Sequence, residues 1–220
     1  MTTPAISALE ALTERRGFNV FLEYESTNGV ADIVLAQFDD SAVRLRAGGV
    51  LSGTYCDRVD IAVLLGLEEE REQTPEDIAQ SSALSTSTVT SRLRSLAARG
   101  VATRTESHRW LRCGPFPCRL AEAIAVELKL SDWRRALDQA ARYRAFADRT
   151  VVVISDRHRR AASKKADAFA FNRVGLMALS VWAQAEMIIE PEVIPPFDPV
   201  ARFVAGERLW RDLQHRWAAT

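Results

Sequence analysis

Apolar residues occur along this chain in two patterns, short dense runs and longer runs at helical spacing. The dense runs predict strands over residues 18–24, 30–38, 42–46, 123–130, 150–154, 175–182 and 187–189. Helical spacing predicts helices over residues 4–15, 58–67, 75–82, 85–99, 132–147, 157–171 and 199–217. Strands that alternate with helices in this way predict an α/β fold with a mixed sheet.

Residues 49–113 differ in character from the segments on either side. Thr74 and Pro75 are typical of a helix start, as cap and first helical residue, and Gly100 is typical of a helix end. Three predicted helices are followed here by a predicted hairpin over residues 101–112. This order resembles the winged helix-turn-helix domains of bacterial transcription regulators.

The third helix of this segment has two different faces. Val89, Leu93 and Leu96 stand at helical spacing and would pack on the helix before. The opposite face and the hairpin offer hydroxyl groups and arginines, which suit phosphates and base edges in a major groove. The candidate DNA-binding residues are Thr86, Ser87, Thr90, Ser91, Arg94, Arg104 and Arg109. The alternative is a small helical domain for protein contact or dimerisation.

Charged side chains interrupt two predicted strands that are otherwise apolar. Asp32 lies in one of them, and Glu127 and Lys129 leave the same face of the other. Charges among buried strands are costly unless they are paired or bound to metal. If the two strands lie side by side, the carboxylates can ligate Mg²⁺ or Mn²⁺ and the lysine can orient a water. The alternative is an exposed strand face, with Asp32 as a cap at the strand start.

The order helix, strand, strand with Asp32, strand with Glu127-x-Lys129, helix, strand resembles the PD-(D/E)xK nuclease superfamily. Gln139 and Tyr143, four residues apart on the next helix, match the Q-x-x-x-Y motif of its RecB-like branch. The resemblance implies a restriction-endonuclease-like αβββαβ core with metal ligands Asp32 and Glu127. It implies the catalytic set Asp32, Glu127, Lys129, Gln139, Tyr143 and Glu10, with Glu14 as the alternative to Glu10 on nearly the same face of the first helix.

The chain departs from the family pattern at two points. Ala31 stands where a proline usually precedes the motif aspartate, and the gap between Asp32 and Glu127 is longer than usual. An insertion accounts for the gap. The prediction is therefore a discontinuous nuclease-like domain over residues 1–48 and 114–220, with a winged-helix domain over residues 49–113 inserted into it.

Charge and composition bear on the expected binding partners and cellular location of the protein. Across the 220 residues, 29 Lys and Arg balance 29 Asp and Glu, so bulk charge gives no attraction to DNA. Basic residues gather locally in residues 131–165, where the arginines form either a phosphate-binding or a solvated face: Arg134, Arg135, Arg142 and Arg144. The three cysteines show no zinc or disulfide pattern, which predicts reduced thiols. The sequence also shows no signal peptide and no apolar run of membrane length. We therefore expect a cytoplasmic protein with no membrane partner.

These observations together predict a Mg²⁺- or Mn²⁺-dependent DNA endonuclease whose winged helix binds DNA. Cleavage of both strands would favour a homodimer, and a role in defence or repair would bring partner proteins of such a system. The alternative from another class is a DNA-binding transcriptional regulator on a catalytically inactive nuclease fold, which binds DNA without cutting it.

Overall fold

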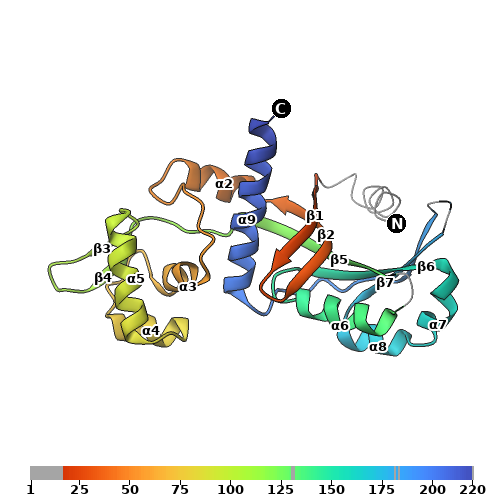
Figure 1. Cartoon of the computed structure of the whole chain (residues 1–220). Helices are drawn as coiled ribbons and strands as arrows, with labels where there is room; N and C mark the ends of the chain where they lie inside the picture. The colour runs from red at the N-terminus through yellow and green to blue at the C-terminus, as the bar shows by residue number, and fades with distance from the viewer. Residues whose placement is uncertain (1–16, 130–131, 181, 183, 220) are drawn as a thin grey trace. The chain divides into compact units, whose positions relative to one another are not determined.

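The computed structural model describes residues 17–129, 132–180, 182 and 184–219, which form two compact units (Figure 1). The first unit comprises the chain up to Phe38 and Leu120–Arg202, and the second comprises Asp39–Arg119 and the chain from Phe203 on. The helix predicted over residues 4–15 lies outside the described residues, and with it Glu10. None of the described helices is long and apolar enough to cross a membrane.

The first unit is built on a mixed six-stranded sheet of order β1-β2-β5-β6-β7-β8. Its strands are β1 (Asn19–Ser26), β2 (Gly29–Phe38), β5 (Leu120–Lys129), β6 (Arg149–Ser155), β7 (Gly175–Leu179) and β8 (Ala185–Ile189). β5, β6 and β7 are parallel, while the pairs β1–β2, β2–β5 and β7–β8 are antiparallel. The predicted α/β class with a mixed sheet is confirmed, and each of these strands overlaps a predicted range.

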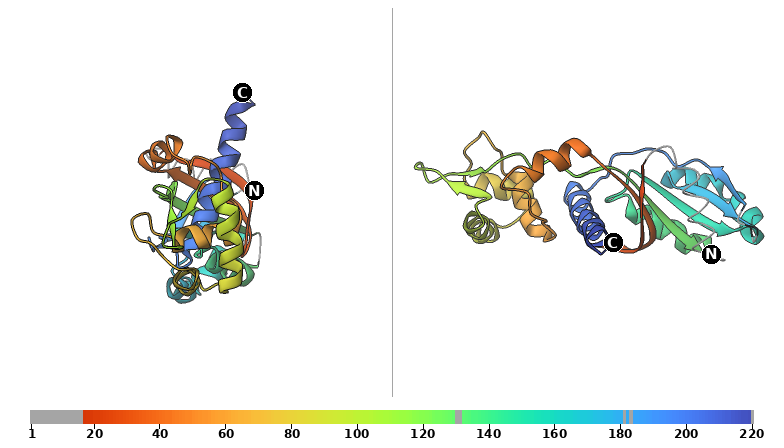
Figure 2. Two further views of the ribbon diagram at one scale, coloured as in Figure 1. Left: turned by 90° about the vertical axis from the view of Figure 1, so that its left-hand side faces the viewer. Right: turned by 90° about the horizontal axis from the view of Figure 1, so that it is seen from above.

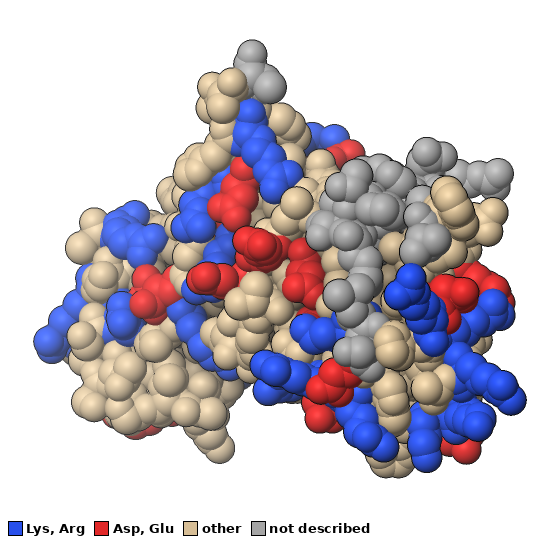
Figure 3. Space-filling model, turned by 45° about the vertical axis from the view of Figure 1, so that its right-hand side comes forward, with Lys and Arg blue, Asp and Glu red and all other residues tan. Residues whose placement is uncertain are grey.

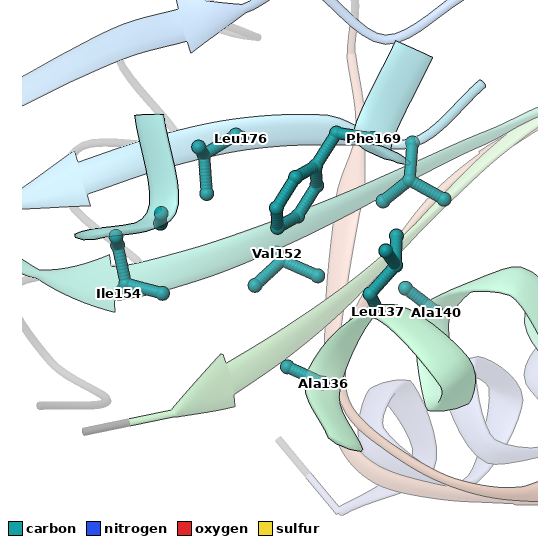
Figure 4. Close-up of a cluster of buried hydrophobic side chains, with 9 residues drawn as sticks. Ala136, Leu137, Ala140, Val152, Ile154, Phe169 and Leu176 are labelled. Atoms are coloured by element: carbon teal, nitrogen blue, oxygen red, sulfur yellow. The ribbon is translucent and has the colours of Figure 1, made fainter. Parts of the chain in front are cut away.

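Short helices pack against one face of this sheet. They are α6 (Trp133–Tyr143), the 3₁₀ helix η1 (Asp156–His158), α7 (Arg159–Ser163) and α8 (Ala166–Asn172). Figure 4 shows Leu137 of α6 and Phe169 of α8 against Val152 and Leu176 of the sheet, all of them buried. On the opposite face, a second apolar cluster includes Ile33 of β2 and residues of β5, β6 and β7. The central strands are therefore buried on both sides, which explains their dense apolar runs.

Three predicted elements of the chain differ from the structure. Residues 42–46, predicted as a strand, lie in helix α2 (Asp40–Ala47), because the Asp39 carboxylate caps the backbone N–H groups of Ser41 and Ala42. The helix predicted over residues 157–171 is divided into η1, α7 and α8. The N-cap of α6 is Asp132, which accepts from a backbone N–H, and that helix ends at Tyr143 rather than near residue 147.

The second unit carries the three helices and the hairpin predicted for the middle of the chain. They are α3 (Arg58–Gly66), α4 (Pro75–Ser82), α5 (Thr86–Ala98), β3 (Ala102–Arg104) and β4 (Trp110–Arg112), and the last helix is α9 (Pro199–Ala218). Thr74 and Asp77 form a capping box at the start of α4. The antiparallel hairpin projects from the helices in Figure 1 and in the right-hand view of Figure 2.

A buried ion-pair cluster within the second unit was not anticipated by the sequence analysis. Glu207 of α9 is 1% exposed and lies between two buried arginines, Arg46 of α2 and Arg119. Its carboxylate accepts from Arg119 Nη1 at 2.6 Å, from the backbone N–H of Tyr55 at 2.9 Å, and from Arg46. Arg46 also donates to the carbonyl of Leu51 at 3.0 Å. Two buried cations thus share one buried carboxylate.

Candidate active site

The strands that carry Asp32 and Glu127 are neighbours in the sheet. β2 and β5 pair with Ile33 opposite Val126, and the same register places Asp32 beside Glu127 at the next position. Directly opposed residues of an antiparallel pair leave the same face of a sheet. Asp32 Oδ2 also accepts the backbone N–H of Leu128 at 2.7 Å, so its carboxylate is held against β5. The predicted juxtaposition of the two strands is confirmed.

Glu127 is the centre of a small polar network on the face of the sheet that α6 covers. Its side chain is 1% exposed, and each carboxylate oxygen has a partner. Oε1 forms an ion pair with Lys129 Nζ at 2.7 Å, and Oε2 accepts the Tyr143 hydroxyl at 2.7 Å. Lys129 keeps 29% of its side chain exposed. The strand face therefore holds a buried carboxylate next to a cation that still reaches solvent.

Tyr143 connects α6 to both strands of the site. Its ring is fully buried, and its single hydroxyl proton lies between two acceptors, the carbonyl oxygen of Val30 and Glu127 Oε2. Burial raises the pKa of the Tyr143 phenol, and the hydrogen bond to Glu127 and its negative charge raise it further. Tyr143 therefore remains a neutral donor throughout the physiological pH range.

Gln139 lies one helical turn before Tyr143 on α6, so the two side chains share a helix face. Its Oε1 atom is buried and has no hydrogen-bond partner among the described residues. A buried acceptor without a donor carries a free-energy penalty of about 1–3 kcal/mol. It is therefore an acceptor available to a water or another donor group.

The donor set suits a hard divalent cation. Asp32 and Glu127 supply two carboxylates against one ammonium group, which leaves a net negative charge where they meet. Mg²⁺ is commonly bound through one or two carboxylates, with waters and substrate phosphates as its other ligands. Within the part of the chain that the structure describes, no group of three or more His, Cys, Asp or Glu is placed to hold a metal.

The candidate DNA-binding residues of the second unit lie on α5 and on the hairpin. Ser87, Ser91 and Arg94 are exposed on α5, and Arg104 and Arg109 are exposed on the hairpin. Thr86 and Thr90 are half-buried, and the Thr90 hydroxyl donates to the carbonyl of Thr86 at 2.8 Å. The apolar face of the same helix is buried, as predicted, through Val89, Leu93 and Leu96.

Arg92 of α5 is already engaged within the second unit. It forms ion pairs with Asp60 at 3.3 Å and with Asp57 at 3.7 Å. Asp60 also pairs with Arg99 at 3.0 Å. Since these carboxylates hold Arg92 at the start of α3, Arg94 is the stronger candidate for a contact with DNA on this helix.

The three cysteines, Cys56, Cys113 and Cys118, form no disulfide bond among the described residues, and their exposure is intermediate. Burial raises the pKa of Cys56 and of Cys113, so both favour the neutral thiol at neutral pH. Neither thiol has the lowered pKa of a nucleophilic cysteine.

Comparison with known proteins identifies no family for this chain: no family model, curated protein or solved structure matches it. The candidate site therefore stands on its own geometry. That geometry brings Asp32, Glu127, Lys129 and Tyr143 into one network and places Gln139 on the same helix face.

Proposed function

We propose that this protein is a Mg²⁺- or Mn²⁺-dependent DNA endonuclease of the PD-(D/E)xK type that binds DNA through a winged helix. The single observation that carries the proposal is the network around Glu127. Asp32 comes from the neighbouring strand, Lys129 pairs with Glu127, and Tyr143 of the Q-x-x-x-Y helix donates to it. The motif residues are far apart in the chain, yet this network joins them.

In the proposed mechanism, Asp32 and Glu127 would hold the divalent cation. The chemistry that such a cation supplies is charge neutralisation on the phosphate and easier deprotonation of water. Lys129 holds the attacking water and offsets the negative charge that develops on the phosphate. Tyr143 fixes the orientation of the Glu127 carboxylate, and Gln139 offers its free acceptor to a water in the site.

The winged helix in this proposal corresponds to residues 49–113, which include α3, α4, α5 and the β3–β4 hairpin. Arg94, Arg104 and Arg109 are exposed and have no ion-pair partner within the described chain. Their contribution to binding would come mainly through DNA phosphates, so affinity should fall steeply with salt. The proposal also includes a homodimer, which would cleave both DNA strands, and partner proteins of a defence or repair system.

The test is DNA cleavage by the full chain, with plasmid and linear DNA and with Mg²⁺, Mn²⁺ or EDTA. Lys129→Ala and Glu127→Gln should each lower the cleavage rate by about 100-fold or more, as loss of one charge-stabilising group does. Glu122→Gln is the matched control, because Glu122 lies on the same strand and pairs with Arg149 at 3.1 Å. If all four proteins cleave equally, or none cleaves any substrate with either metal, the nuclease proposal is wrong.

A second candidate is a DNA-binding regulator on an inactive nuclease fold. It is favoured by the occupation of both Glu127 oxygens within the chain, by Lys129 and by Tyr143. This candidate predicts DNA binding that EDTA does not alter and that Arg94→Ala weakens, with no cleavage under any condition. Metal-dependent cleavage by the wild type would exclude it.

A further inference from the structure

A basic groove lies in the first unit, next to the carboxyl ends of β5 and β6. It has a volume of about 670 Å³ and is lined by seven residues, none of which is Asp or Glu. The lining includes five cations and one indole: Arg134, Arg157, Arg160, Lys164, Lys165 and Trp133. Figure 3 shows blue side chains gathered over this part of the molecule.

The cations of this groove lack carboxylate partners within the part of the chain that the structure describes. All five side chains are exposed, and none forms an ion pair with a carboxylate of the described residues. Arg160 and Lys164 stand four residues apart, a spacing at which like charges on a helix repel each other. Arg134 lies over the ring of Trp133 at 4.9 Å from its centroid, which anchors one wall of the groove. A bound polyanion would offset the repulsion that the fold leaves uncompensated.

The groove and the candidate active site lie at the same edge of the sheet. β5 and β6 are parallel, with Lys129 opposite Ile154, so both strands end at this edge. Trp133 follows Lys129 by four residues and Arg157 follows Ile154 by three. Four residues span at most about 14 Å, so the groove begins only a few nucleotides of strand length from Lys129.

We infer that this groove binds phosphates of the DNA strand that flanks the scissile bond, a few nucleotides away from Glu127. The inference rests on the proposed nuclease function, which it deepens by assigning the path of the substrate strand. A groove of this volume accommodates a ligand of drug-like size, which is close to a nucleotide or two of a single strand. Of the four arginines that the sequence suggests for phosphate binding, only Arg134 lines it.

The experiment measures binding of the full chain to a labelled DNA duplex in EDTA, so that no hydrolysis occurs, over a range of salt concentrations. Each phosphate contact contributes about 0.9 to the slope of log affinity against log salt. This slope is negative, and the double variant R160A/K164A should therefore reduce its magnitude by about 1.8. Between about 50 and 200 mM salt, the wild type should lose about tenfold more affinity than this variant.

The matched control is R44A/R71A, which also removes two exposed cations and lies outside the groove, at positions with no proposed role in catalysis or DNA binding. Its slope should stay close to that of the wild type. An equal fall in both double variants would show only a general charge effect and would overturn the inference. An unchanged slope in R160A/K164A, or a wild type that binds no DNA, would also overturn it.

Cleavage assays of the same proteins separate this inference from the proposed function. A lower slope in R160A/K164A without any metal-dependent cleavage by the wild type would support the groove and refute the nuclease. Cleavage that depends on Lys129, together with unchanged slopes, would support the nuclease and refute the groove.

Discussion

Replacing Tyr143 by phenylalanine tests whether the network around Glu127 is as tightly coupled as the structure shows. The substitution removes one oxygen atom and keeps the buried ring. Glu127, 1% exposed, then loses the donor that lies 2.7 Å from Oε2. A hydrogen bond to a charged group contributes about 1.5–3 kcal/mol, so we expect the free energy of unfolding of the first unit to fall by about 2 kcal/mol.

Hydrogen exchange of the amides of β5 and α6, measured without divalent metal, reports this loss for the first unit alone. A loss of about 2 kcal/mol corresponds to roughly 30-fold faster exchange from globally opening amides. In a Glu127→Gln background the acceptor is neutral, so the same Tyr143→Phe change should cost only about 1 kcal/mol. Equal costs in the two backgrounds would refute the charge-assisted bond.

The pH dependence gives a second measure of the same bond. The folded-state pKa of Tyr143 lies above its unfolded value of about 10, so its stabilising contribution is complete below about pH 10 and is lost above it. The stability difference between wild type and Tyr143→Phe should be constant from pH 7 to about 9. Above about pH 10 it should shrink by about 1.4 kcal/mol per pH unit. A difference that grows with pH would contradict the raised pKa.

Three further predictions concern other parts of the chain. Glu207→Ala leaves two buried arginines without a counter-charge, so it should lower the free energy of unfolding by about 3–5 kcal/mol in chemical denaturation. Asp212→Ala, at an exposed ion pair, is the control and should change that free energy by less than about 1 kcal/mol. Because burial raises their pKa values, Cys56 and Cys113 should react with iodoacetamide at pH 7 more slowly than a free cysteine, and labelling at the free-thiol rate would contradict this. Thr74→Ala removes one half of the capping box of α4 and should lower the free energy of unfolding by about 1 kcal/mol, measured by thermal denaturation; an unchanged melting temperature would contradict a stabilising cap.

Periodicity and capping signals were sufficient to locate most elements. The capping box at Thr74 and the glycine after α5 mark helix ends whose causes are local in the chain. The dense apolar runs of β2, β5 and β6 reflect burial on both faces, which is itself visible in the sequence. The strand predicted over residues 42–46 was wrong because the apolar alternation covers only five residues, and the Asp39 cap starts a helix there instead.

The candidate site was predictable as a set of residue types but not as a network. Asp32 and Glu127 are 95 positions apart by their numbering, and only the register of β2 against β5 makes them neighbours. The basic groove was likewise not predictable from the sequence, because the number of arginines along α6 does not tell which of them face η1 and α7. Its cations gather because a helix start and a strand end meet at one edge of the sheet.

The sequence by itself determined the alternation of strands and helices, the helix caps, and the three charged positions on two otherwise apolar strands, because these depend on neighbours within a few residues. Tertiary structure alone decided that Tyr143 donates to Glu127, that Glu207 lies between two buried arginines, and which cations line one groove. The physical reason is that hydrogen bonds and ion pairs act over a few Å in space. Strand register and helix packing bring distant parts of the chain within that range.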